Sequence, residues 1–349
     1  MKKNIQMLGI TIVINILLSV CIVYFGYFAL NSENRTSNRT NTNSTQAQEV
    51  SRIAILTPVT HQSLEQIEKG FRETLEKSDK KRYEFTTYNA NGNKTLLRAQ
   101  ADEIVNNNFD LIFTIGAQAS QLIKAISLKK QNTVPIVFGA VSEPVQLGLV
   151  QSCEKPGGSV TGVVETADFK TQIELLRTIK PDVKNILLLY DPTQKGGLEK
   201  EKQAVEKIVI GLGLKLIPIE VFGIGEIYPK LQASITQADV VLVLKDNTVV
   251  SAIDGVIKLC NMHHVTLLTS DLDSGDKGAV LSYGVEERQF GVHGAELARK
   301  ILEEKAQPAV LPCVEIKDRV FKVNSRMLEQ QGLRISPEQL LLYKFVTVI

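Results

Sequence analysis

Residues 239–252 constrain the fold of this chain more than any other stretch of its sequence. Within them, residues 240–244 are five consecutive apolar residues of types that favour strands, with no polar alternation. Such a run is typical of a strand covered on both faces, and hence of a parallel sheet. Apolar residues at helical spacing follow from Val249 to Ile257, so the chain is expected to turn from strand to helix here.

The polar residues between this strand and this helix are the first candidates for a binding site. Asp246, Asn247 and Thr248 are residue types that cap helix N-termini. They also stand at the carboxyl end of a strand, where α/β sheets bind small ligands. We therefore expect the ligand near these residues, with a purely structural capping role as an equally weighted alternative.

Strand and helix signals alternate along the rest of the chain. In the first half, strands are expected at residues 52–56, 83–88, 110–114, 134–138 and 160–164, and helices at residues 64–75, 95–106 and 118–128. A second series has expected strands at residues 185–190, 215–220, 240–244, 265–269 and 279–283, and helices at residues 198–212, 226–236 and 248–261. The chain closes with a helix at residues 290–303, a strand at 314–324 and a short helix at 325–331.

This alternation predicts βαβ units with parallel sheets and right-handed crossovers. At 349 residues the chain exceeds one ordinary hydrophobic core. The fold class that we predict is therefore α/β, with two doubly wound parallel-sheet lobes.

The first fifty residues differ from the rest in composition. Residues 8–30 contain no charged side chain; as a helix they would span about 34 Å, enough to cross a hydrocarbon core of about 30 Å. We expect a membrane anchor over residues 1–30, or alternatively a cleaved or lipidated signal segment. Lys2 and Lys3 favour a cytoplasmic N-terminus, with the remainder outside. Residues 31–50 are almost wholly polar and are expected to form a disordered tether.

The loops that follow the expected strands contain the other candidate site residues. Parallel strands end at a common edge of their sheet, so two such edges that face each other form a cleft. The candidate ligand-binding residues in these loops are His61, Gln118, Ser142, Glu143, Asp191, Asp246, Asn247, Thr248 and Asp271.

Several function classes are disfavoured by composition and motifs. The net charge of +2 is not gathered into a basic stripe, so no nucleic-acid partner is expected. Cysteine and histidine spacing indicates no metal site, and it leaves open whether Cys153, Cys260 or Cys313 forms a disulfide. The chain has no GxSxG elbow, no GxxxxGK phosphate loop and no GxGxxG after its first strand. We therefore expect no enzyme activity, no catalytic residues and no cofactor.

Four motifs lie in or beside these loops. They occupy residues 135–144 with 148–150, residues 155–163, residues 246–252, and Gly278 and Ala279 leading to Gly284 and Gly291. Together they resemble the family of periplasmic type I ligand-binding proteins of ABC transporters that includes tryptophan and tyrosine transport receptors. The chain departs from that family's pattern after Gly284, where Glu286, Glu287 and Arg288 replace aromatic residues that are often found there.

The resemblance implies two lobes that close on a small ligand. Lobe 1 would comprise residues 51–162 and 286–311, and lobe 2 residues 163–285 and 312–349, with three chain crossings at the hinge. The implied function is that of the substrate-binding component of an ABC importer, which delivers its ligand to a permease and the associated ATPase. The implied location is the extracytoplasmic face of the cell membrane, or the periplasm if the N-terminal segment is cleaved.

The ligand that the resemblance implies is an amino acid, in the first place an aromatic or other apolar one. Its ammonium group needs acceptors, for which Asp246, Asp271 and Glu143 are candidates. Its carboxylate needs donors, which helix N-terminal amides behind Ala117 and Thr248 and the hydroxyls of Ser142 and Thr248 can supply. Two alternatives stay open: a membrane-tethered sensing domain that acts through a partner protein, and a receptor for a sugar or nucleoside.

Overall fold

The computed structural model describes residues 50–194, 198–336, 338 and 346–348, and residues Glu49–Ile349 form one compact unit. Within the described ranges, no helix has the length and apolar composition needed to span a bilayer. The anchor or signal segment expected at residues 1–30 lies outside the described residues, and so does the expected tether except for Val50. Both expectations stay predictions.

The first lobe is built on a six-stranded sheet with the order β11–β5–β4–β3–β1–β2. Its strands are β1 (Val50–Thr57), β2 (Arg82–Asn89), β3 (Leu111–Ile115), β4 (Ile136–Val141), β5 (Val160–Val164) and β11 (Val314–Glu315). All neighbouring strands in this sheet are parallel, as the alternating pattern predicts. All five residues of β3 are buried, which is the pattern of a strand covered on both faces.

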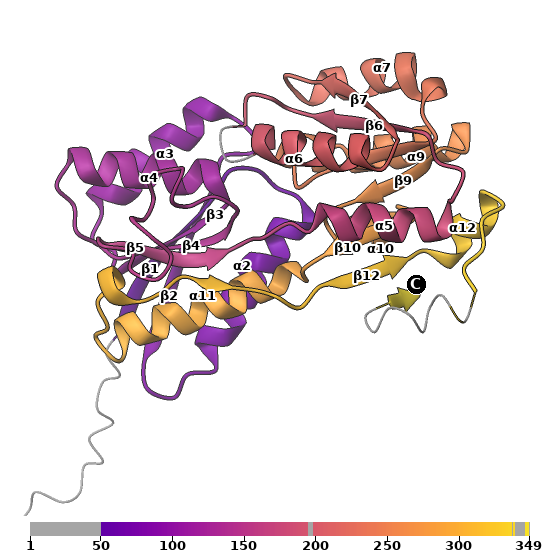
Figure 1. The fold of residues 1–349 in the computed structure, drawn as a ribbon. Helices are drawn as coiled ribbons and strands as arrows, with labels where there is room; N and C mark the ends of the chain where they lie inside the picture. The colour runs from indigo at the N-terminus through magenta and orange to yellow at the C-terminus, as the bar shows by residue number, and fades with distance from the viewer. Residues whose placement is uncertain (1–49, 195–197, 337, 339–345, 349) are drawn as a thin grey trace, which may run out of the picture. The chain divides into compact units, whose positions relative to one another are not determined.

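Helices cover both faces of this sheet (Figure 1). They are α2 (Gln62–Glu76), α3 (Lys94–Asn106), α4 (Ala117–Lys129) and α11 (Glu287–Leu302). Helices α2 and α11 pack on one face, where Phe71 stacks on Phe113 of β3. Helices α3 and α4 pack on the other face, around Leu97 and Ile123. This apolar burial, at about 25 cal/mol per Å², is the main stabilising contribution to the lobe.

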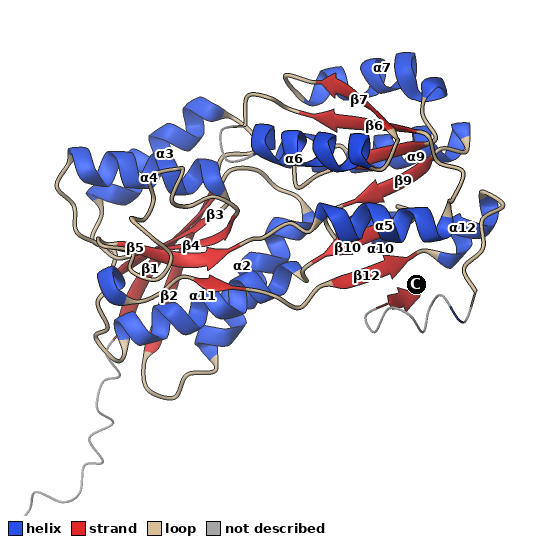
Figure 2. Cartoon of the chain, in the orientation of Figure 1, coloured by secondary structure: helices blue, strands red, loops and turns tan. Residues whose placement is uncertain are grey.

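The second lobe is built on a seven-stranded sheet with the order β13–β12–β10–β9–β8–β6–β7 (Figure 2). Its strands are β6 (Asn185–Tyr190), β7 (Lys215–Glu220), β8 (Val240–Val243), β9 (Thr266–Thr269), β10 (Leu281–Gly284), β12 (Val320–Val323) and β13 (Val346–Val348). Its helices are α5 (Phe169–Ile179), α6 (Leu198–Gly211), α7 (Ile224–Ser234), α8 (Asn247–Val250), α9 (Ile253–His263), α10 (Asp273–Lys277) and α12 (Ser325–Gln330), with 3-10 turns at Ile235–Gln237 in this lobe and Pro308–Val310 in the first. Helices α5 and α6 cover one face and α7 and α9 the other.

The chain passes between the lobes three times, as predicted. The crossings follow β5, β10 and β11, each of which leads into an element of the other lobe. The sheets place residues 163–164 and 314–315 in the first lobe, because Val314 pairs with Val163 beside β4. The first and third crossings therefore lie a few residues later in the chain than the boundaries expected after residues 162 and 311.

The prediction of a single strand at residues 314–324 is wrong. This stretch is divided between the two sheets, with β11 in the first and β12 in the second. The third crossing separates the two halves, and Val320 enters the second sheet opposite Gly284, the residue where β10 leaves it. Strand β12 therefore runs antiparallel to β10, and the second sheet is mixed where a wholly parallel one was predicted.

The continuous helix expected at residues 248–261 is also divided in two. Helix α8 ends at Val250 and α9 begins at Ile253. Between them the backbone of Ala252 leaves the helical region, at φ −110° and ψ 18°. Ser251 donates its hydroxyl to the carbonyl oxygen of Asn247, a local side-chain bond of the kind that competes with helix continuation.

Candidate ligand-binding site

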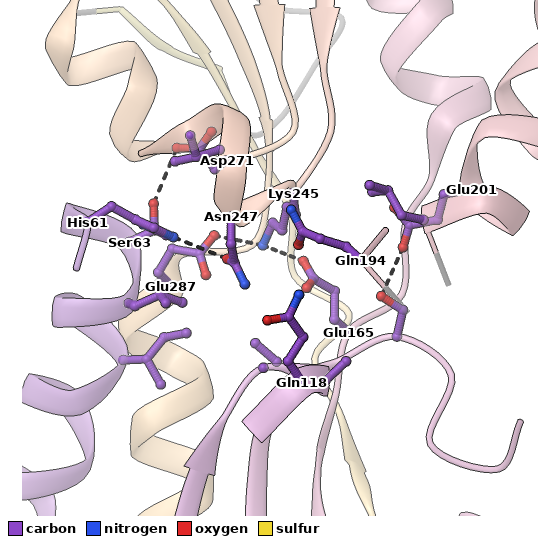
Figure 3. A pocket seen from close by; sticks show the side chains of 18 residues that line it. His61, Ser63, Gln118, Glu165, Gln194, Glu201, Lys245, Asn247, Asp271 and Glu287 are labelled. Atoms are coloured by element: carbon purple, nitrogen blue, oxygen red, sulfur yellow. Dashed lines mark hydrogen bonds and ion pairs between the residues drawn. The ribbon is translucent and has the colours of Figure 1, made fainter. Parts of the chain in front are cut away.

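A cavity lies where the carboxyl ends of strands from both sheets face each other. Its lining residues come from the loops and helix starts after β1, β3 and β4 of the first lobe and after β6, β8 and β9 of the second, with the crossings after β5 and β10 completing it (Figure 3). The polar lining residues are His61, Ser63, Gln118, Ser142, Glu165, Gln194, Glu201, Lys245, Asn247, Asp271 and Glu287. This is the location in which α/β sheets bind small molecules.

An ion-pair cluster centred on Lys245 forms part of the cavity wall. Lys245 follows β8 and pairs with Glu165, which follows β5, and with Glu287, the first residue of α11, at 2.7 Å. Its ammonium group also lies 4.9 Å from the ring centroid of Phe290, a cation–π distance. One side chain of the second lobe is thereby joined to two of the three crossing segments.

The two carboxyl groups of this cluster share one ammonium group and are largely buried. The side chains of Glu287 and Glu165 are only 4% and 12% exposed. Burial raises the pKa of Glu287, and the Lys245 ammonium offsets part of that rise. Burial lowers the pKa of Lys245, but the two carboxylates raise it by more, so Lys245 stays charged.

A third glutamate, Glu201 in α6, completes the acidic side of the cavity. Its carboxylate accepts a hydrogen bond of 2.9 Å from the Ser142 hydroxyl across the lobes. Burial, together with the nearby Glu165 carboxylate, raises the pKa of Glu201 to about 7. At neutral pH this carboxyl group is thus close to half protonated.

Hydrogen bonds between the lobes surround the cavity. Nε2 of His61 lies 3.2 Å from Oδ1 of Asn247, an oxygen that only accepts, so Nε2 is the donor. Burial lowers the pKa of His61, which keeps the ring neutral at pH 7. The Ser63 hydroxyl donates to Asp271 at 3.3 Å. The lobes are therefore in direct contact at residues that line the cavity.

The structure places five of the nine sequence-predicted residues in the cavity wall: His61, Gln118, Ser142, Asn247 and Asp271. Asp191 and Thr248 instead line a neighbouring cavity that Gln118, Gln194 and Asn247 also border. Glu143 borders neither cavity and pairs with Lys200 at 2.6 Å, with side chains 33% and 57% exposed.

Asp246, the residue most favoured from sequence as a ligand group, is a structural cap. It is 0% exposed, and its carboxylate accepts the amides of Thr248 and Val249 at 2.9 and 3.1 Å. It also accepts the amide of Asp191 at 2.6 Å and the side-chain amide of Gln194. Burial raises the pKa of Asp246 to about 6, against these donors. Asp246 thus links the ends of β6 and β8 by hydrogen bonds behind the cavity.

Six polar residues of the cavity wall were not among the ligand-binding candidates from sequence: Ser63, Glu165, Gln194, Glu201, Lys245 and Glu287. Glu165 directly follows β5 and Lys245 lies two residues after the end of β8, so the rule that selected the other residues could have found them. Glu201 lies inside α6 among residues of alternating charge, a pattern typical of a solvated helix face. No sequence signal separated it from its neighbours.

Within the described ranges, no group of three or more His, Cys, Asp or Glu side chains could hold a metal ion. The described cysteines, Cys153, Cys260 and Cys313, are free.

Comparison with known proteins decides the family. A sequence model of the family described as ABC transporter substrate binding protein matches residues 52–348. The chain belongs to this family. The resemblance inferred from the four motifs is thereby confirmed.

Members and structural neighbours of the family are similar to the chain over most of its length. A tyrosine-binding protein of Clostridioides difficile is 27% identical over 279 residues, covering 79% of each chain. The structure of a conserved domain protein from Vibrio cholerae matches at a TM-score of 0.79 with 27% identity, covering 85% of this chain and 99% of that one. An ABC domain from Streptococcus pneumonia, in complex with L-Trp, has the same fold at a TM-score of 0.78 and 23% identity, covering 86% of this chain and 100% of that one.

Proposed function

We propose that this chain is the extracytoplasmic binding component of an ABC importer that captures a small amino-acid-type ligand and delivers it to a permease and its ATPase. The cavity between the two sheets carries this proposal, because residues of both lobes line it. A ligand that touches both lobes stabilises their closed arrangement, and a permease can then recognise that arrangement. The chain would bind its ligand without changing it chemically.

The cavity offers partners for each part of an amino acid. Glu165, Glu201 and Glu287 can accept from an ammonium group. The N-cap residue of α4 is Gly116, which provides no side-chain cap, so the first amides of the helix are available to a carboxylate.

The apolar part of the cavity wall supports an aromatic or other apolar side chain on the ligand. It consists of Leu64, Ile67, Leu198 and Val250. A relative named a tyrosine-binding protein and the fold neighbour with bound L-Trp support the same ligand class.

Calorimetric titration of the chain against the twenty amino acids, nucleosides and simple sugars tests this function. We expect saturable binding of at least one amino acid, with a ligand-dependent rise in melting temperature that follows mass action. Binding of a sugar or nucleoside with no amino-acid response would refute the amino-acid assignment. Amino-acid binding by a chain that associates with a signalling partner and with no permease would favour the sensing alternative.

We further propose that residues 1–30 hold the binding lobes at the membrane. A tether of about nineteen residues has a coil dimension of roughly 24 Å, which keeps a receptor close to its transporter and lets a weak docking surface suffice. Fractionation with N-terminal sequencing should find the intact N-terminus in the membrane fraction. A soluble protein that begins between Asn31 and Val50 would contradict the anchor, and a lipid on Cys21 would replace it with a different one.

A further inference from the structure

The charges that line the cavity are unequal in number and sign. Among the described residues, the wall contains four carboxyl groups, those of Glu165, Glu201, Asp271 and Glu287. Against them stands the single ammonium group of Lys245, since His61 is neutral at pH 7. The described wall contains no arginine, the residue type best suited to hold a carboxylate in two parallel hydrogen bonds.

A ligand carboxylate would therefore meet mostly neutral donors in a field of negative charge. The available donors include the first amides of α4 and the side-chain amides of Gln118 and Asn247, whereas the side-chain amide of Gln194 already donates to Asp246 and Thr248. Lys245, the one cation in the described part of the wall, is already paired with Glu165 and Glu287. Burying a charge without a charged partner is costly, and like charges nearby add to that cost.

A ligand ammonium group would meet the opposite situation. Glu201 has the Ser142 hydroxyl as its donor, and the charged groups that act on it are Glu165, Lys245 and Glu143. Two of these three are carboxylates, so Glu201 lacks a full counter-charge. Burial raises the pKa values of both Glu201 and Glu287, and the nearby Glu165 carboxylate raises them further. A cation that enters the cavity would supply the missing counter-charge and displace a proton from these carboxyl groups.

We propose that this cavity selects its ligand for positive charge and not for a carboxylate. The ligand class is small organic amines with an apolar body, including amino-acid derivatives whose carboxylate is absent or masked. The proposal rests on the function proposed above, because it assumes that this cavity binds small ligands with an amine. The amine would lie among Glu165, Glu201 and Glu287, and the apolar body against Leu64 and Val250.

Matched ligand trios test the proposal in the full chain by calorimetry at pH 8. Each trio keeps one apolar body: L-tyrosine, tyramine and 3-(4-hydroxyphenyl)propanoate; L-tryptophan, tryptamine and indole-3-propionate; L-leucine, isoamylamine and 4-methylpentanoate. In the trio that binds, we expect the amine to bind at least as tightly as the amino acid and the acid to give no binding. An amine that binds tenfold or more weakly than its amino acid overturns this proposal and leaves the proposed function intact. A chain that binds no member of any trio refutes both.

A matched pair of variants tests whether the amine group of the ligand binds beside Glu201. Glu201→Gln should weaken binding of the amine about tenfold or more, a loss of about 1.4 kcal/mol or more. It should also reduce the proton release near pH 7, measured by calorimetry in buffers of different ionisation enthalpy. The control is Glu199→Gln. Glu199 lies two residues from Glu201 in α6 and its side chain is 54% exposed, so its substitution should change neither the affinity for the amine nor the proton release. Equal behaviour of the two variants contradicts the placement.

Discussion

Lys245→Met is expected to lower the free energy of unfolding of the unliganded chain by about 3–5 kcal/mol at pH 8. The substitution keeps the length of the side chain but removes the cation that pairs with Glu165 and Glu287, whose side chains are 12% and 4% exposed. Two carboxylates would then be buried side by side without a counter-charge. Chemical denaturation monitored by circular dichroism measures the loss.

The same variant should be strongly pH-dependent. A carboxyl group whose pKa is raised in the folded state contributes stability at low pH, and that contribution is lost as the pH rises through the raised pKa. Burial already raises the pKa of Glu287 in the presence of Lys245, and removal of the lysine raises it further. The loss in Lys245→Met should therefore shrink as the pH falls from 8 to 5.

Lys200→Met is the matched control. Lys200 also pairs with a glutamate across the lobes, Glu143 at 2.6 Å, but its side chain is 57% exposed. Exposed pairs contribute at most about 1 kcal/mol, so this variant should stay near wild type at both pH values. If Lys245→Met were as stable as Lys200→Met at pH 8, the buried ion-pair cluster would have no energetic role.

Asp246→Ala should lower the free energy of unfolding by about 2–4 kcal/mol and leave ligand binding largely unchanged. The substitution removes an N-cap, worth about 0.5–2 kcal/mol. It also leaves the amide of Asp191 without its 2.6 Å acceptor, and an unsatisfied buried group costs about 1–3 kcal/mol. The ligand-dependent rise in melting temperature should survive, because Asp246 does not line the cavity.

Asn93→Ala provides the comparison for a cap alone. Asn93 caps α3 by accepting from the amides of Thr95 and Leu96, and it is exposed. Its replacement should cost only about 1 kcal/mol. Loss of ligand binding in Asp246→Ala with unchanged stability would instead make Asp246 a ligand group, as residues 239–252 first suggested.

The fold was predictable from sequence wherever one periodicity ran without interruption. Strands β5, β6 and β7 begin and end at the expected residues, because their apolar runs are bounded by polar residues and turns. The predictions fail where the arrangement of the lobes, and not the local sequence pattern, determines where an element begins or ends. Residues 314–324 have strand-like residues on both sides of the charged residues 317–319, but the third crossing divides them between two sheets. Helix α5 was not predicted, although it buries Phe169, Ile173 and Leu176 at helical spacing.

The site was predictable only as far as strand ends define it. His61, Gln118 and Asn247 follow strands and line the cavity. Glu201 and Glu287 lie in helices that reach the cavity because of how the lobes and crossings are arranged, which no local pattern encodes. Asp246 has the right residue type and position, but its oxygens point back to the amides of its own helix. Residue type alone could not separate a cap from a ligand group.

A cavity-blocking variant tests the central claim that the ligand binds between the two sheets. Ala117 is the first residue of α4 and lines the cavity, whereas Ala125 lies on the exposed side of the same helix. Calorimetry should show that the wild-type chain and Ala125→Trp bind the same amine or amino acid equally well. Ala117→Trp should bind it at least a hundredfold more weakly, about 2.7 kcal/mol, while melting at a similar temperature without ligand. Undiminished binding by Ala117→Trp would place the ligand elsewhere and contradict the account.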